Sequence, residues 1–165
     1  MNSNTTYNDM VCGMEVNTDH ISFDYMGIHY AFCSDQCLQC FQKNPHIYIG
    51  FPGNEAPKHA GMEVIKTRTL KLADPLPREL VEKVTEYIQA MMGIQYVEVH
   101  DDCIEITYDL LQATETQIEE AIADAGAVLG GDWTEKIKRA FVHYMEETEV
   151  ETLEARPVSR RRYSH

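Results

Sequence analysis

Apolar residues in the second two thirds of the chain recur at spacings of three and four along three stretches. This period is typical of helices that bury one face. The first stretch follows a proline-containing helix entry at residues 74–77, and the second begins with the capping pair Thr114 and Gln117. The third extends over residues 132–155. The apolar positions of the three predicted helices are Leu80, Val81, Val84, Tyr87, Ile88 and Met91, then Ile118, Ala121, Ile122 and Ala125, then Trp133, Ile137, Ala140, Phe141, Tyr144 and Met145.

Segments with the alternation typical of strands lie between these helices. Residues 64–72 alternate ahead of the first helix, and residues 95–100 and 103–108 form a pair joined by two aspartates. A short apolar piece at residues 127–129 follows the second helix. The predicted order βαββαβ is that of the split βαβ, ferredoxin-like arrangement, with two helices on one face of a four-stranded antiparallel sheet.

The last predicted helix adds an apolar stripe to an already complete βαββαβ unit. The stripe is rich in aromatic residues, including Trp133, Phe141 and Tyr144, and it needs a surface to pack against. Two alternatives stay open. The helix covers the open face of the sheet, or it packs against a second copy of the chain and forms a homodimer.

The pattern of the first fifty residues predicts elements that are shorter than those of the rest of the chain. Residues 11–14, Val-Cys-Gly-Met, form a tight turn, and residues 22–32 form two short strands around a Met-Gly turn. Ser34 then fits the N-cap of a helix that ends near Lys43. This part of the chain is therefore a small module built from a hairpin and a helix.

A cluster of proline and glycine between residues 50 and 61 breaks both the helical and the strand period, which indicates a linker. The sequence thus predicts an α+β protein, in which a small cysteine-rich module precedes a ferredoxin-like domain with an added C-terminal helix. The predicted boundaries are 8–50 for the cysteine-rich module, 51–61 for the linker, 62–131 for the ferredoxin-like domain, 132–155 for the C-terminal helix and 156–165 for a basic tail.

Four of the five cysteines fall within the cysteine-rich module. Cys37 and Cys40 lie three residues apart on the predicted helix, and Cys33 lies one turn before Cys37, so these sulfur atoms share one face. The hairpin has to bring only Cys12 to that face to complete a cage of three or four thiolates. A helix N-terminus also favours the thiolate, which is the form that binds metal. Because packing does not explain four converging thiols, we interpret them as soft-metal ligands.

The residues around these cysteines resemble a known family. They are Val11-Cys12-Gly13-Met14, Tyr25, Gly27, Tyr30, Phe32-Cys33-Ser34, Cys37, Phe41, Pro45 and Tyr48. Over residues 11–48 the chain resembles the YHS domain, a relative of the TRASH metal-binding modules. YHS domains are found attached to copper and heavy-metal transporting ATPases and to other metal-handling proteins. The resemblance therefore implies metal binding through Cys12, Cys33 and Cys37, and a metal-transporting ATPase or another metal-handling protein as a partner.

Cys40 is not part of this family pattern. It is either a fourth ligand or a thiol on the inner face of the helix. The fifth cysteine, Cys103, lies in a predicted strand outside the module, next to the turn that joins the strand pair. We interpret Cys103 as an ordinary strand cysteine.

The second domain resembles the heavy-metal-associated domain of copper chaperones and of metal-transporting ATPases. The matching residues, within 64–130, are Gly93-Ile94, Val97, Val99, Ile104, Ile106, Tyr108-Asp109, Ile118, Ala121-Ile122 and Ala125-Gly126. That family binds metal through a Cys-x-x-Cys in the loop before the first helix, but residues 73–77 here read Ala-Asp-Pro-Leu-Pro. No metal site carries over, and the domain is expected to be a scaffold or a docking surface.

The charge of the chain argues against several kinds of partner. Its 27 acidic and 14 basic residues give a net charge of -13, which repels nucleic acid and anionic membranes. We interpret the arginines of the tail, Arg156, Arg160, Arg161 and Arg162, as a solvated terminus. The sequence shows no secretory signal and no run of membrane-spanning length. We therefore expect no nucleic-acid partner, no membrane insertion and a cytoplasmic protein with reduced cysteines.

The number of thiolates decides which metal fits. Three thiolates, with or without the Met14 thioether, favour Cu(I) and a site that exchanges its ion. Four thiolates in a closed tetrahedron favour a structural Zn²⁺. No acid, base or nucleophile pattern accompanies the thiols, so we expect no enzymatic activity.

The sequence therefore predicts a protein that binds a soft heavy-metal ion, copper first and zinc second, in metal trafficking, sensing or resistance. The main alternative is a non-catalytic interaction or assembly protein whose zinc is structural. A further alternative is a thiol redox protein that uses Cys37 and Cys40, although this pair lacks the thioredoxin context.

Overall fold

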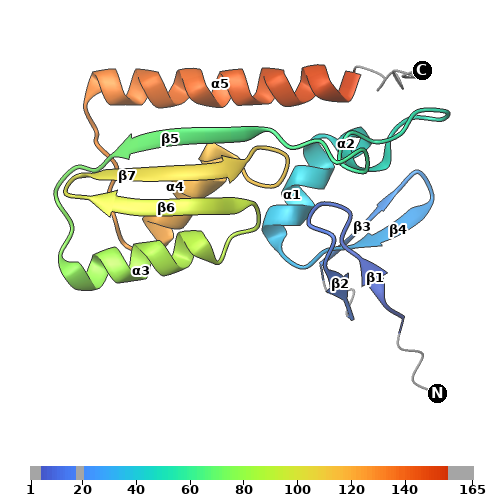
Figure 1. Cartoon of the computed structure of the whole chain (residues 1–165), viewed down its shortest axis with the longest axis horizontal. Helices are drawn as coiled ribbons and strands as arrows, with labels where there is room; N and C mark the ends of the chain where they lie inside the picture. Colours follow the sequence, from blue (N-terminus) through green and yellow to red (C-terminus); the bar gives the residue numbers. More distant parts are fainter. Residues whose placement is uncertain (1–4, 18–20, 156–165) are drawn as a thin grey trace, which may run out of the picture. The chain divides into compact units, whose positions relative to one another are not determined.

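The computed structural model describes residues 5–17 and 21–155, and its mixture of helices and strands confirms the predicted α+β class. The predicted basic tail, 156–165, lies outside the described residues. The chain divides into two compact units (Figure 1): the first holds residues up to 62 and the end of the last helix from residue 149, and the second holds residues 63–148. Within the described ranges, no helix has both the length and the apolar run that crossing a membrane requires.

The first unit contains two antiparallel strand pairs followed by two helices. The pairs are β1 (Tyr7–Asn8) with β2 (Glu15–Val16), and β3 (Ser22–Tyr25) with β4 (Ile28–Ala31). The helices are α1 (Asp35–Lys43) and α2 (Pro45–Ile49). The structure contains the predicted hairpin and the predicted helix at α1. The sequence pattern does not predict β1, β2 and α2, because elements of two to five residues are too short to show a period.

Two local sequence signals explain how β3, β4 and α1 form. Met26 and Gly27 have positive φ values of 50° and 78°, as a two-residue hairpin turn with the twist of its strands requires. Ser34 caps α1, because its hydroxyl accepts a hydrogen bond from the backbone N–H of Cys37 at 3.4 Å. The cap fixes the start of the helix between Cys33 and Cys37.

Phe41 of α1 lies at the centre of the first unit's core and is fully buried. The rings whose centroids lie 4.8 to 6.2 Å from that of Phe41 are Phe23, Tyr25, Tyr30, Phe32 and Tyr48. Aromatic pairs at such separations stabilise a core beyond their buried area. The cysteine-rich module therefore has a hydrophobic core of its own.

The second unit is built on a three-stranded antiparallel sheet. Its elements are β5 (Ile65–Lys71), α3 (Arg78–Gln89), β6 (Ile94–His100), β7 (Cys103–Asp109) and α4 (Glu115–Asp124). The strand order is β5-β7-β6, with Leu70 opposite Ile104 in one pair and Val99 opposite Ile104 in the other. The α4 helix begins with the predicted capping box, in which Thr114 and Gln117 satisfy each other's backbone N–H groups.

The fourth strand of the predicted sheet is reduced to an isolated bridge between Leu72 and Leu129. Two hydrogen bonds support this bridge, from Ala73 N–H to Val128 C=O and from Gly130 N–H to Lys71 C=O, both at 2.8 Å. The bridge lies beside β5, where the fourth strand of the predicted arrangement belongs. A full strand does not form because two glycines follow Leu129 directly and the last helix begins soon after them.

The last helix, α5 (Trp133–Ala155), is held in the second unit by charged and polar side chains. Glu146, 3% exposed, accepts hydrogen bonds from the Glu115 backbone N–H at 2.8 Å and from the Tyr108 hydroxyl. Arg139 donates to the carbonyl of Gly130 at 2.9 Å and pairs with Glu119 at 2.9 Å. The side of α5 that faces the other elements of the second unit is therefore largely polar.

The apolar stripe predicted for this helix lies on its exposed side. Trp133 is 76% exposed, Phe141 62% and Tyr144 65%, and Ile137 and Met145 are each about half exposed. Figure 1 shows α5 running alongside β5. The described residues do not bury the stripe. The stripe therefore does not cover the open face of the sheet.

Glu115 links α4 to α5 and provides a pH-dependent prediction. Burial, together with the negative charges of Glu146 and Glu119, raises the pKa of Glu115 to about 7. Its Oε2 is buried and has no hydrogen-bond partner among the described residues. Because the folded state binds this proton more tightly than the unfolded state, the Glu115 contribution to stability falls as pH rises from about 4.5 to 7.

We expect the Glu115→Gln substitution to remove this loss of stability. The variant should be more stable than the wild type at pH 8 by about 1 kcal/mol, because a neutral amide replaces a buried carboxylate. The measurement is urea unfolding followed by circular dichroism at pH 5 and pH 8. A variant with the same pH dependence as the wild type would contradict the assignment to Glu115.

Candidate metal centre

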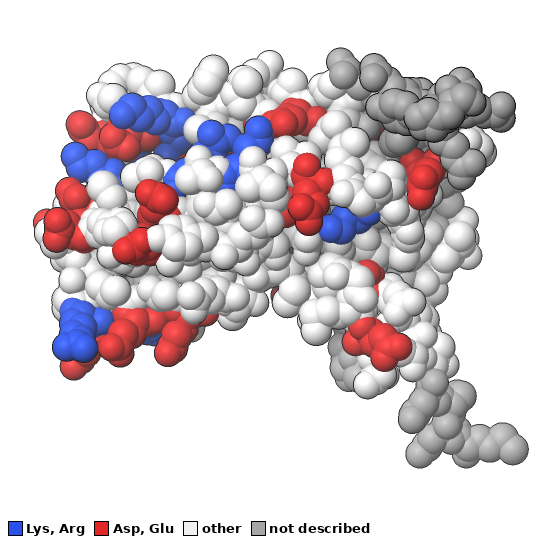
Figure 2. Space-filling model, in the orientation of Figure 1, with Lys and Arg blue, Asp and Glu red and all other residues white. Residues whose placement is uncertain are grey.

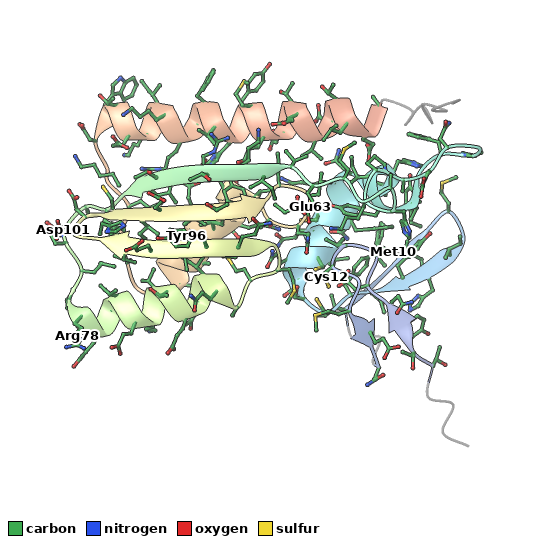
Figure 3. The ribbon with its side chains drawn as sticks, in the orientation of Figure 1. Met10, Cys12, Glu63, Arg78, Tyr96 and Asp101 are labelled. Atoms are coloured by element: carbon green, nitrogen blue, oxygen red, sulfur yellow. The ribbon has the colours of Figure 1, made fainter. Side chains whose placement is uncertain are left out.

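Three thiols of the first unit come together from three separate elements. Cys12 lies in the turn between β1 and β2, Cys33 lies two residues after the end of β4, and Cys37 lies in the first turn of α1. The Sγ atoms of Cys12 and Cys33 are 3.4 Å apart, and those of Cys33 and Cys37 are 3.6 Å apart. Figure 3 shows Cys12 on its loop beside α1. The structure thus brings together three of the four predicted ligands.

Asp9 completes this group and is the residue that sequence reasoning missed. One carboxylate oxygen of Asp9 and the three Sγ atoms all lie within 4.8 Å of one another. Its Oδ1 accepts hydrogen bonds from the backbone N–H groups of Val11 at 2.8 Å and Cys12 at 3.2 Å. Its Oδ2 accepts one from the Cys33 backbone N–H at 2.8 Å. A single buried carboxylate therefore ties together the two loops that carry Cys12 and Cys33.

A local signal for Asp9 exists in the sequence. An aspartate whose side chain accepts hydrogen bonds from the backbone two and three residues later is a common turn pattern, and Asp9 stands in that relation to Val11 and Cys12. The contact with Cys33 spans 24 residues and leaves no such signal. The pKa of Asp9 reflects both environments: burial raises it, but the backbone N–H groups of Cys33, Val11 and Cys12 outweigh burial and lower it.

Cys40 lies outside the group formed by Asp9, Cys12, Cys33 and Cys37. It is buried on α1, about one turn beyond Cys37. Met14, in the turn after Cys12, is about half exposed. Cys103 belongs to the second unit, where its thiol lies 3.5 Å from Asp102. Ligation by Cys40 or by Met14 remains a prediction.

The three thiols differ in how readily they lose a proton. A hydrogen bond from Cys37 lowers the pKa of Cys12 to about 7. Burial and the hydrogen bond to Asp9 raise the pKa of Cys33 to about 11. The hydrogen bond with Cys12 and burial raise the pKa of Cys37 as well. Without metal, Cys12 is therefore the thiol that ionises first, because the neighbouring thiols stabilise its thiolate.

The spacing of the sulfur atoms suits a metal ion. Ligand sulfurs at about 2.3 Å from a tetrahedral metal are about 3.8 Å from one another, and the separations here are 3.4 and 3.6 Å. A disulfide would need about 2.05 Å, and all five cysteines are free. Small shifts of the side chains are therefore enough to place three sulfurs around one cation. Binding of the cation would displace the protons of Cys33 and Cys37.

A second group of potential ligands lies in the second unit. It consists of Glu115, Glu119 and His143. Glu119 already contacts both Arg139 and His143, and the Arg139 guanidinium balances its charge. We interpret this group as part of the polar contact between α4 and α5.

Comparisons with known proteins agree with the location of the thiol group. Residues 7–50 match the family described as the YHS domain, so this segment is a YHS domain. The match begins at Tyr7, the first residue of β1. It therefore includes Asp9 as well as Cys12, Cys33 and Cys37. The comparison with curated proteins gives no match.

Among solved structures, the chain is similar to the solution structure of apo-CopP from Helicobacter pylori. The identity is 21%, the TM-score is 0.36, and the match covers 39% of this chain and 98% of that one. The resemblance of the second unit to heavy-metal-associated domains remains a prediction.

Proposed function

We propose that this protein binds a soft metal ion through Cys12, Cys33 and Cys37 and passes it on, in metal trafficking, sensing or resistance. The observation that carries the proposal is the convergence of three thiols from three elements around Asp9 in the YHS segment. The first candidate for the ion is Cu(I), because three thiolates without a further soft donor suit this ion. The proposed role is binding and transfer, without a catalytic step.

The exposure of the thiols supports an ion that can enter and leave. Cys12 and Cys33 are partly exposed, whereas Cys37 is buried. Cys12 also has the lowest thiol pKa of the three, about 7. An incoming ion can therefore meet a thiolate at Cys12 first and then displace protons from Cys33 and Cys37. Release by the reverse route requires a partner with its own thiolates, and we propose a metal-transporting ATPase or another metal-handling protein.

Structural Zn²⁺ is the alternative, and the position of Asp9 favours it. A carboxylate oxygen of Asp9 lies within 4.8 Å of the three sulfurs, and three thiolates with one carboxylate make a four-donor set for zinc. Against this, both oxygens of Asp9 already accept backbone hydrogen bonds. The aromatic core around Phe41 also gives the module a means of folding without metal.

Metal content and exchange separate the two alternatives. The full chain is purified anaerobically, loaded with Cu(I) or Zn²⁺, analysed for metal, and challenged with a Cu(I) chelator. We expect one Cu(I) per chain that the chelator removes reversibly, lost in Cys33→Ser and retained in the matched variant Cys40→Ser. Cys40 is the suitable control because it is a buried cysteine of α1, in the same unit as Cys33 but outside the thiol group.

Other outcomes would redirect the proposal. Tightly held Zn²⁺, whose removal unfolds the module in both variants, would make the metal structural and assign the function to an interaction partner. Equal loss of Cu(I) from Cys33→Ser and Cys40→Ser with the fold intact would make Cys40 a fourth ligand. If the anaerobically prepared chain binds neither ion, the proposed function is wrong.

A further inference from the structure

A feature that the proposed function does not explain is the exposed apolar stripe of α5. It consists of Trp133, Ile137, Phe141, Tyr144 and Met145, which lie on one side of the helix and are 47% to 76% exposed. Since an aromatic side chain has roughly 150–250 Å² of surface, the three rings alone expose about 400 Å² on one helix face. This is a large share of the roughly 800 Å² per partner that a standard interface buries.

The opposite side of α5 makes polar contacts with the rest of the second unit. These contacts fix the rotation of the helix about its own axis. Glu146 binds Tyr108 and the backbone of Glu115, and Arg139 binds Gly130 and Glu119. Turning the stripe inward would break these contacts and leave buried charges without partners, at a high energetic cost. The stripe therefore faces outward because the other side of the helix is fixed.

The charges of α5 are distributed unevenly along its length. Its first part carries Lys136 and Lys138, the second of which pairs with Glu135, whereas its later part carries Glu147, Glu149 and Glu151. Figure 2 shows lysine and arginine side chains gathered over the first part of α5 and the neighbouring β5. Two such helices placed side by side in opposite directions would bring the basic part of each next to the acidic part of the other.

We propose that two copies of the chain form a homodimer by antiparallel pairing of their α5 helices, independently of the metal centre. A twofold axis near Phe141 places Lys136 opposite the partner subunit's Glu147. These two residues are exposed and lie eleven positions, about three helical turns, apart, and so on the same flank of the stripe. The same side chains meet on both copies, as a closed twofold interface requires.

A second copy fits this surface better than a membrane does. The net charge of -13 repels an anionic bilayer, and the acidic second part of α5 would lie at that bilayer. In the antiparallel dimer the same acidic part meets the basic part of the partner. The charge pattern thus favours the second copy as the occupant.

Sedimentation equilibrium of the full chain over a dilution series tests the proposal. The mass is expected to be twice the 18.9 kDa of one chain and to fall towards 18.9 kDa on dilution. Trp133 is the only tryptophan and lies at one end of the stripe, so its emission should shift to longer wavelength as the dimer dissociates.

Phe141→Glu should raise the dissociation constant of the dimer about a hundredfold or more. Tyr87→Glu, at an aromatic residue of α3 that is 45% exposed, is the matched control and should leave it unchanged.

Charge reversal tests the direction of the helices. Lys136→Glu alone and Glu147→Lys alone should each weaken the dimer about tenfold, because each places like charges opposite one another twice. The double variant should regain the wild-type constant within about threefold. Far-ultraviolet circular dichroism confirms that each variant is folded.

Several results would overturn the proposal. They are a wild-type chain that stays monomeric at every concentration, a dimer that survives in Phe141→Glu, or a double variant weaker than both single reversals. A monomeric chain that binds vesicles of neutral phosphatidylcholine through Trp133 would assign the stripe to a membrane surface instead.

Discussion

Replacing Asp9 with alanine should lower the affinity of the thiol group for its metal about 10- to 100-fold, the range found when residues that orient metal ligands are removed. Asp9 is 1% exposed, and its carboxylate holds the backbone N–H groups of Val11, Cys12 and Cys33. Without it, the loops that carry Cys12 and Cys33 lose their shared anchor. The thiols then no longer converge before the metal arrives.

The same substitution should destabilise the metal-free first unit. Three backbone N–H groups lose a charged acceptor, and a buried donor without a partner costs about 1–3 kcal/mol. Because part of the site is open to water, we expect a total loss of about 3 kcal/mol. The measurements are urea unfolding of the metal-free chain and competition for Cu(I) by a chelator of known affinity.

Two further variants define what Asp9 contributes. Asp9→Asn keeps one oxygen for Val11 and Cys12 but presents an amide N–H₂ to Cys33, so it should lie between the wild type and the alanine variant in stability and affinity. Asp24→Ala removes a largely exposed aspartate of the same unit, paired with His29, and should change neither. If Asp9→Ala retained the wild-type affinity, the carboxylate would have no part in the metal centre.

Replacing Glu146 with alanine should destabilise the second unit by about 3–5 kcal/mol, the range found when one partner of a buried ion pair is removed. Glu146 is 3% exposed and accepts hydrogen bonds from the Tyr108 hydroxyl and the Glu115 backbone, and Arg68 lies 3.8 Å away. Burial and the negative charge of Glu146 hold the pKa of Tyr108 well above its ordinary value. After the substitution, the Arg68 guanidinium and the Tyr108 hydroxyl stay behind in the protein without this acceptor.

The controls for Glu146 separate charge from hydrogen bonding. Glu146→Gln keeps an acceptor for Tyr108 and Glu115 but removes the charge beside Arg68, so it should lose less stability than the alanine variant. Glu120→Ala, at an exposed glutamate of α4, should remain within about 0.5 kcal/mol of the wild type. The measurement is urea unfolding at one fixed protein concentration. Equal stability of the Glu146→Ala and Glu120→Ala variants would show that Glu146 does not hold α5 in place.

Elements specified by neighbouring residues could be predicted from the sequence. The Met26-Gly27 hairpin turn, the Ser34 cap of α1 and the capping box at Thr114 are all present in the structure. Each depends on contacts within about four residues, so the pattern of residue types carries the whole signal. The fourth strand could not be predicted in the same way, because its length depends on how much of residues 127–131 reaches β5.

The thiol group shows where local information ends. The sequence by itself determined that Cys33 and Cys37 flank the start of a helix, because helical spacing and the Ser34 cap fix their relation. Only the tertiary structure decided that Cys12 and Asp9 join them, through a hydrogen bond between residues 24 positions apart. It also decided that Cys40 lies outside the group.

The C-terminal helix shows the same division on a larger scale. The sequence determined that residues 133–155 form a helix with an aromatic stripe, because periodicity is a property of the segment alone. Only the tertiary structure decided which side of that helix faces its own domain. The buried contacts of Arg139 and Glu146 fix its orientation, and these depend on Glu119, Tyr108 and Arg68, which lie on other elements. An amphipathic pattern indicates that a helix has an apolar face, whereas the polar contacts of the folded chain determine that this face points away from the rest of the second unit.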